Sequence, residues 1–134
     1  MIEERAKWLR IAFIAGAVTD AGALLPMLLP SQASLVWGLD GLPASFWFAM
    51  NYGAALMLGW TVLLVWAALR PMERRFVAPM TALVVAGLAL AEAASAYNGT
   101  VSAAKLAPIW ALQTILFVLF ATAYVKSGNA QDAR

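Results

Sequence analysis

The chain has 134 residues, of which 63% are hydrophobic and 12% are charged, and its net charge is +2. Soluble domains are about 45–50% apolar and about 25% charged, so this composition excludes an ordinary soluble domain and indicates an integral membrane protein. The chain has no cysteine and no histidine, which excludes disulfides, thiolate chemistry, the usual haem ligand and the usual neutral-pH proton shuttle. We therefore expect no resident metal site and no cofactor.

Four apolar segments follow one another along the chain and predict four transmembrane helices. They are expected at about residues 8–29, 46–69, 72–97 and 106–126. About 20 helical residues cross a bilayer core of roughly 30 Å, and each segment reaches that length. None shows the period-2 alternation of a membrane strand. The predicted fold class is therefore all-α: a single domain over residues 1–134 that forms a four-transmembrane-helix bundle.

Helix-breaking residues separate these segments. Pro26 and Pro30 are expected to end the first segment, and the stretch 31–45, with its glycines and proline, is expected to be a loop. Arg70-Pro71 is expected to end the second segment and 98–100 the third. The four helices should therefore be joined by short connections.

The basic residues predict how the chain crosses the membrane. Of the nine Lys and Arg residues, eight precede the first segment, lie between the second and third, or follow the fourth. Only Lys105 lies on the other side. The positive-inside rule then places both termini and the middle connection in the cytoplasm. The Ala-rich composition is typical of bacterial proteins, so the expected location is a bacterial inner membrane.

Each apolar segment carries one strongly polar side chain in its outer half. These side chains are Asp20, Asn51, Glu92 and Gln113. At 1.5 Å per residue, Asp20 should lie roughly 15 Å from the outer end of its helix and the other three roughly 8–9 Å from theirs. The inner half has only isolated threonines, which can bond to their own helix backbone. The polar groups of interest are therefore predicted in the outer half of the span.

The two carboxylates need compensation. A carboxylate at the centre of a membrane helix costs about 2.5–3.5 kcal/mol, and no Lys or Arg is expected at the depth of Asp20 or Glu92. Three solutions remain open: protonation of one or both groups, a proton shared by the pair, or a ligand that brings the cation. That ligand could be an amine, a metal ion or a transported proton. Asn51 and Gln113 can donate and accept hydrogen bonds to it.

Two interpretations of these residues remain open. Intramembrane ionisable groups are functional by default, which favours a functional role for Asp20 and Glu92. Asn51 and Gln113 can equally serve to hold helices together, since an interhelical hydrogen bond stabilises a membrane protein by about 0.6 kcal/mol. Small residues near both carboxylates place them on or beside an inward-facing stripe. Three aromatic residues can line an outer pocket or lie at the membrane interface. The predicted ligand-binding set is Asp20, Asn51, Glu92, Gln113, Tyr52, Tyr97 and Trp110.

Two patterns resemble known groups of proteins. The run Leu64-Leu-Val-Trp-Ala-Ala-Leu-Arg-Pro-Met-Glu-Arg-Arg75, with Trp37-Gly38 before it, resembles a group of uncharacterised bacterial four-helix membrane proteins, which implies no function. The second pattern consists of Asp20, then Leu24-Leu25-Pro26 and Pro30, and then Ser45-Phe46-Trp47-Phe48 leading to Asn51. It resembles the EXPERA superfamily, which includes emopamil-binding sterol isomerases and related receptors for lipophilic amines.

The EXPERA resemblance implies helices around a membrane pocket, in which buried carboxylates bind a cationic amine or move a proton on a sterol. By position, Asp20 would match the acid of the first helix. Asn51 stands where that family has a glutamate, and the histidine of the isomerases has no counterpart in this chain. These departures weigh more against an isomerase than against a binding protein.

Three functions are compatible with the sequence. The first is a pocket for a lipophilic small molecule, either cationic or sterol- or lipid-like, with an isomerase as its enzymatic variant. The second is a small proton-coupled exporter acting as a homodimer, similar to small multidrug transporters in size and in having a membrane carboxylate. The third is a non-catalytic subunit of a membrane complex. The expected partners are membrane lipids and a lipophilic small molecule, and no nucleic acid.

Overall fold

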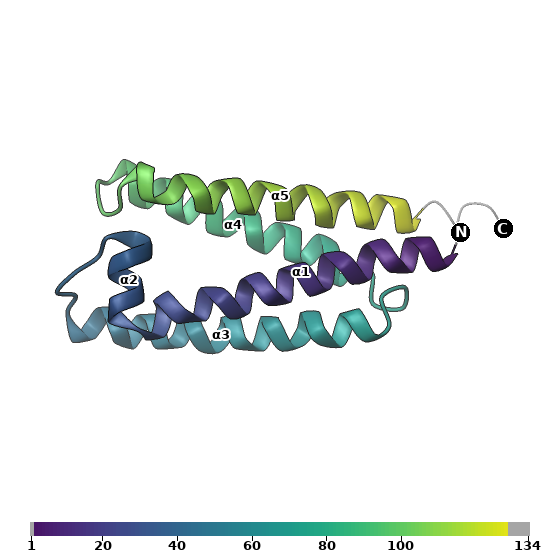
Figure 1. Ribbon diagram of the computed structural model, residues 1–134, viewed down its shortest axis with the longest axis horizontal. Coiled ribbons are helices and arrows are strands. Elements are labelled where there is room, and N and C mark those ends of the chain that lie inside the picture. Colours follow the sequence, from purple (N-terminus) through teal and green to yellow (C-terminus); the bar gives the residue numbers. More distant parts are fainter. Residues whose placement is uncertain (1, 129–134) are drawn as a thin grey trace.

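The computed structural model describes residues 2–128, which form five helices and no strand (Figure 1). The helices are α1 (Ile2–Leu28), α2 (Pro30–Trp37), α3 (Ala44–Leu69), α4 (Val77–Tyr97) and α5 (Ala103–Gly128). Four of them, α1, α3, α4 and α5, are long and apolar enough to cross a membrane. The predicted all-α class and the four candidate spans are therefore confirmed.

Many large apolar side chains lie on the outside of the bundle. Val18 is 68% exposed, Leu56 77% and Leu90 72%. A soluble protein rarely exposes a continuous apolar surface of this kind, whereas hydrocarbon tails solvate it at no cost. The exposed surface and the four spans together define a multi-pass membrane protein.

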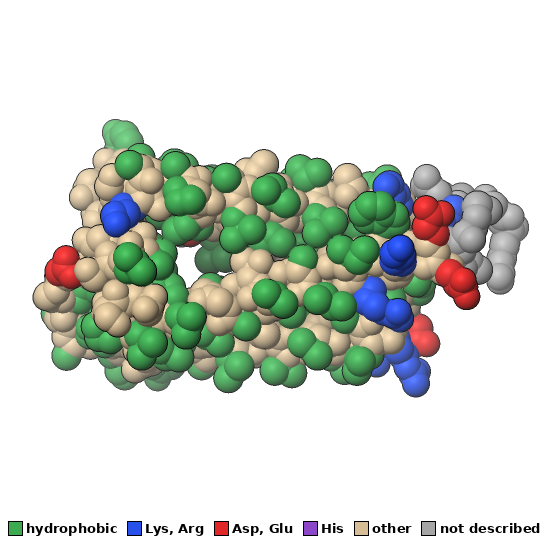
Figure 2. Space-filling model, in the orientation of Figure 1, with side chains coloured by type: hydrophobic (Ala, Val, Ile, Leu, Met, Phe, Trp, Pro, Cys, Tyr) green, Lys and Arg blue, Asp and Glu red, His purple; other side chains and the backbone are tan. Residues whose placement is uncertain are grey.

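The four long helices are arranged as two pairs. Helix α1 packs along α3, helix α4 packs along α5, and the pairs meet mainly through α1 and α5 (Figure 1). The start of α1 and the end of α5 lie at the same end of the bundle (Figure 1). Lys and Arg side chains gather at this end, which we call the basic end (Figure 2). We call the opposite end, where α2 lies, the α2 end.

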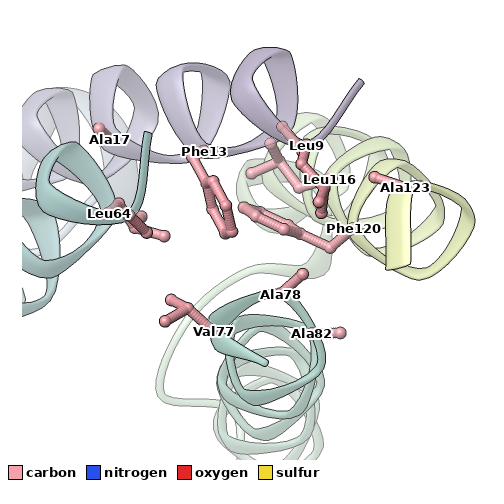
Figure 3. Close-up of a cluster of buried hydrophobic side chains, with 12 residues drawn as sticks. Leu9, Phe13, Ala17, Leu64, Val77, Ala78, Ala82, Leu116, Phe120 and Ala123 are labelled. Carbon is pink, nitrogen blue, oxygen red and sulfur yellow. The ribbon is translucent and has the colours of Figure 1, made fainter. Parts of the chain in front are cut away.

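A packed apolar cluster, the inner core, joins the two pairs in the half of the bundle near the basic end (Figure 3). Its largest members are Leu9, Phe13, Leu64, Val77, Leu116 and Phe120. The rings of Phe13 and Phe120 point toward each other from α1 and α5, with their centroids 6.1 Å apart. A Cβ atom on Gly16 would lie 2.7 Å from Cζ of Phe120, so this glycine makes room for the ring. The inner core closes this half of the bundle.

The other half of the bundle is open. Beyond the inner core, toward α2, the space-filling view shows a gap between the two helix pairs (Figure 2). Helix α2 spans the far side of this gap and reaches α5, where Lys105 Nζ donates a hydrogen bond to the carbonyl oxygen of Leu35 at 3.1 Å. The one basic residue that the described part of the chain has at the α2 end therefore caps the last turn of α2, where a positive charge is favourable.

Arginines cap helix ends at the basic end. The last carbonyls of a helix have no partner within it, so they need other donors. Arg10 Nε donates to the carbonyl oxygen of Ala68 at 3.2 Å, and Arg75 donates to that of Ser127 at 3.3 Å. Arg74 donates to a third carbonyl near the end of α3. Residues from α1 and from the connection between α3 and α4 therefore stabilise the ends of α3 and α5.

Helix α2 was not predicted, because its residues were expected to form a loop. Pro30 occupies its first turn, where a missing N–H has no cost. Gly38 ends it with a φ of 69°, and its N–H bonds to the Ser34 carbonyl at 2.9 Å. Pro26 also differs from expectation: it lies within α1, which continues to Leu28. Because Pro26 has no N–H, it cannot bond to the carbonyl oxygen of Gly22, and α1 continues for only two residues beyond it.

Helix α4 begins at Val77 and not at residue 72 as predicted. The stretch 71–76 forms successive turns, with backbone hydrogen bonds from Arg74 to Arg70 at 3.2 Å and from Val77 to Arg74 at 3.0 Å. The turns let Arg74 and Arg75 reach back to the ends of two different helices. In a regular helix over these residues, the directions of Arg74 and Arg75 would instead be fixed about 100° apart around one axis.

Candidate binding site

Glu92 of α4 and Gln113 of α5 meet in the open half of the bundle. Gln113 Nε2 donates a hydrogen bond to Glu92 Oε1 at 3.0 Å. The sequence predicted equal depths for these two residues, and the hydrogen bond places them at the same level. Gln113 lies seven residues, about two helical turns, before Phe120, so both occupy one face of α5. The pair thus lies on the inward side of α5, next to the inner core.

Three polar atoms in this region are buried without a hydrogen-bond partner among the described residues. They are Glu92 Oε2, Gln113 Oε1 and Trp110 Nε1. Trp110 lies beside the Glu92 carboxylate, and we call these three residues the polar cluster. Buried polar groups are nearly always paired, and an unpaired group is more costly still in a membrane. The cluster therefore has hydrogen-bonding capacity for a proton, a water molecule or a ligand.

The unpaired atoms differ in kind. Glu92 Oε2 and Gln113 Oε1 are acceptors when the glutamate is ionised, and the indole N–H is a donor. A proton on Oε2 would supply one donor to a cluster that is short of donors. A ligand with N–H groups would supply several.

Substitutions at Glu92 measure what the polar cluster contributes to stability. Glu92→Gln keeps the shape and an acceptor for Gln113, so we expect the free energy of unfolding to change by less than about 1 kcal/mol. Glu92→Ala leaves the Gln113 amide buried and unpaired, which costs about 1–3 kcal/mol. Unfolding of the purified protein with a denaturing detergent measures both values. An equal loss in the two variants would show that the hydrogen bond at 3.0 Å is not what holds α4 to α5 here.

Asp20 lies on the inward face of α1, in the same half of the bundle. It follows Phe13 by seven residues and therefore shares its face, about two turns farther from the basic end. The side chain is half-buried and makes no hydrogen bond or ion pair with any described residue. Lys105, the one described cation at the α2 end, bonds to a backbone carbonyl instead. No described side chain neutralises Asp20.

The remaining predicted residues lie at the surface. Tyr97 is 92% exposed at the end of α4, and Asn51 and Tyr52 are exposed on α3. The Tyr52 ring lies against Phe48, with centroids 5.1 Å apart. The structure thus brings together Glu92, Gln113 and Trp110, and it does not bring these three surface residues into the polar cluster.

The sequence interpretation missed Trp60. Its indole Nε1 donates to Thr81 Oγ1 at 3.3 Å, and that hydroxyl donates in turn to the Val77 carbonyl at 2.8 Å. The predicted backbone bond of Thr81 is therefore confirmed, but the threonine has a second role, which is to link α3 to α4. The available signal was the indole itself, because a tryptophan N–H within a membrane segment needs an acceptor.

A groove between α4 and α5 adjoins the polar cluster. Its volume is about 580 Å³, and Trp110, Gln113, Leu90 and Phe117 are among its lining residues. Small-molecule sites usually measure about 300–1,000 Å³ and are mostly apolar with a few polar groups. The groove has this character, with Gln113 as its link to Glu92.

No protein-family model, curated protein or solved structure matches the chain. The fold and the site define the class by themselves: a helical membrane protein with four candidate spans, closed at the basic end, with carboxylates in its open half. Its function is therefore argued from the site alone.

Proposed function

We propose that the protein binds a lipophilic cation, such as a hydrophobic amine, in the open half of its membrane span. The observation that carries this proposal is Asp20, a half-buried carboxylate on the inward face of α1 without a described partner. A carboxylate in a low-dielectric region has to be balanced by a cation, by water or by a proton. A ligand that brings its own positive charge meets this need.

Other features of the open half suit the rest of such a ligand. The gap between the helix pairs lies between α2 on one side and the inner core on the other (Figure 2, Figure 3). Glu92 and Gln113 offer unpaired acceptor oxygens for ammonium N–H groups. In the groove between α4 and α5, the Trp110 ring offers a face for a cation–π contact, and the apolar walls of that groove suit a hydrocarbon body. The resemblance to the EXPERA superfamily favours the same class of ligand.

Binding is a simpler function for this site than catalysis. Acid–base isomerisation needs two groups of different acidity at the reacting atoms. Asn51, which stands in place of a glutamate in the resembling pattern, is exposed and does not ionise. We therefore propose a binding protein without enzymatic activity.

The proposed orientation places the basic end in the cytoplasm. Seven of the eight described Lys and Arg residues lie at or next to the basic end, and Lys105 lies at the α2 end. By the positive-inside rule, the open half then faces the outer leaflet of a bacterial inner membrane. A ligand would enter it from that leaflet or from the outer aqueous phase.

A matched pair of ligands tests the proposal. The protein, reconstituted in lipid nanodiscs, is titrated with a hydrophobic quaternary ammonium ion and with its neutral carbon isostere, and tryptophan fluorescence is followed. We expect saturable binding of the cation with roughly a 30-fold preference, because a desolvated charge pair contributes about 2 kcal/mol or more. Equal affinities for the two compounds would contradict a role for charge.

Proton-coupled export is the second candidate. It is favoured by the two acceptors of the polar cluster that have no described hydrogen-bond donor, Glu92 Oε2 and Gln113 Oε1. A proton on Glu92 would supply one such donor. Such an exporter would act as a homodimer, since four helices alone make a thin pathway. Uptake of a hydrophobic amine into proteoliposomes, driven by a pH gradient and abolished by Glu92→Gln, would support export over simple binding.

A further inference from the structure

We propose that the groove between α1 and α3 holds one acyl chain of an anionic phospholipid from the leaflet at the basic end, with the headgroup phosphate on Arg10. This groove has a volume of about 540 Å³ and lies apart from the polar cluster. Its lining is apolar except for Arg10 and Thr61. The proposal does not depend on the proposed cation site.

Small side chains create the groove. Ala17 and Ala21 of α1 and Ala68 of α3 leave space, and Val65 forms part of the wall. The Thr61 hydroxyl donates to a backbone carbonyl of its own helix at 2.9 Å, so its hydrogen is not available to a ligand. The groove along its length thus offers apolar contact and no free donor, which suits a hydrocarbon chain.

Arg10 lies among the lining residues closest to the basic end and is positioned to receive an anion. Its Nε donates to the Ala68 carbonyl at 3.2 Å, which fixes the guanidinium beside the groove. The side chain is exposed and makes no ion pair with any described carboxylate, in contrast to Arg70, which pairs with Glu73 at 3.4 Å. The remaining N–H groups of Arg10 form a planar fork that matches a phosphate.

Two further features favour a phospholipid. Lys7 lies three residues before Arg10, on the same side of α1, and adds a second positive charge near the membrane surface. From Arg10 to Ala21 the groove follows eleven residues of α1, or roughly 16 Å. Half of a bilayer core is roughly 15 Å thick. The groove therefore has the length of one leaflet and its positive charge at the headgroup level.

Native mass spectrometry tests this proposal on the purified chain. The protein is mixed with phosphatidylglycerol or with phosphatidylcholine of identical acyl chains. We expect one phosphatidylglycerol molecule to bind preferentially, and Arg10→Gln to weaken its binding about fivefold. The matched control is Arg70→Gln, which makes the same change in charge at the same end but removes an arginine outside the groove; it should leave binding unchanged. Circular dichroism checks that both variants keep their helices.

A second variant tests the acyl chain separately from the charge. Ala21→Leu fills the groove without altering any ionised group, so we expect it also to weaken phosphatidylglycerol binding severalfold. Equal binding of the two lipids, equal losses in Arg10→Gln and Arg70→Gln, or full binding in Ala21→Leu would each overturn the proposal. So would a dimer whose groove is covered by the second copy and retains no lipid.

Discussion

Asp20→Asn is expected to weaken the binding of a hydrophobic ammonium ion roughly 30-fold, the effect of removing about 2 kcal/mol of charge pairing. Asparagine keeps the size of the side chain and one acceptor oxygen, but it replaces the other oxygen with an NH2 donor and loses the negative charge. No described residue neutralises Asp20. Its negative charge therefore attracts a cationic ligand but gives no such attraction to a neutral one. The same fluorescence titration in nanodiscs measures the change.

The matched control for this prediction is Asp40→Asn. Asp40 is an exposed residue in the connection between α2 and α3, so this variant makes the same change in net charge outside the bundle. It should bind the cation as the unmodified chain does. If both variants lose affinity equally, the effect is one of overall charge. If Asp20→Asn binds normally, Asp20 is not the counter-ion and the proposed function fails.

Phe120→Ala is expected to lower the free energy of unfolding by about 3 kcal/mol, the largest effect on stability of any substitution considered. Phe120 is fully buried, faces Phe13 across the inner core and fills the space above Gly16. Phe→Ala in a packed core costs about 3–5 kcal/mol. The low end applies here, because lipid solvates apolar groups as well as a protein core does and the loss is mainly one of packing.

Unfolding by a denaturing detergent, followed by circular dichroism, measures this loss. Phe117→Ala is the matched control, because Phe117 lies three residues earlier on α5 and is 43% exposed. We expect it to cost less than about 1 kcal/mol. Equal losses at the two positions would show that the inner core does not hold the helix pairs together.

The spans were predictable from sequence, and the way they pair was not. A membrane segment is recognised by its length and continuous apolar character. In a soluble helix the buried face is found from its contrast with a polar face, but here exposed residues such as Val18 and Leu90 are as apolar as the buried Leu64. Hydrophobicity therefore does not show which helices touch. The small residues near Gly16 were the available signal, and that glycine does lie at a close contact.

The candidate site was predictable to a similar extent. Counting residues from the helix ends placed Glu92 and Gln113 at one depth, and they share a hydrogen bond. Depth does not give direction around the helix axis, so Tyr52 and Tyr97 were included although both are exposed. The roles of Trp60 and Trp110 also depend on direction. The Trp60 indole reaches a threonine on another helix, and Trp110 lies beside the Glu92 carboxylate of the neighbouring helix.

The contact between Phe13 and Phe120 separates the two proposed functions by the motion that each requires. A receptor can load and release its ligand through the open half while these rings stay 6.1 Å apart. An exporter must expose the same carboxylates to both sides of the membrane in turn, so it has to part the rings and unseal the basic end once in every cycle. A cross-link that fixes α1 to α5 at this level would leave a receptor working and would stop an exporter.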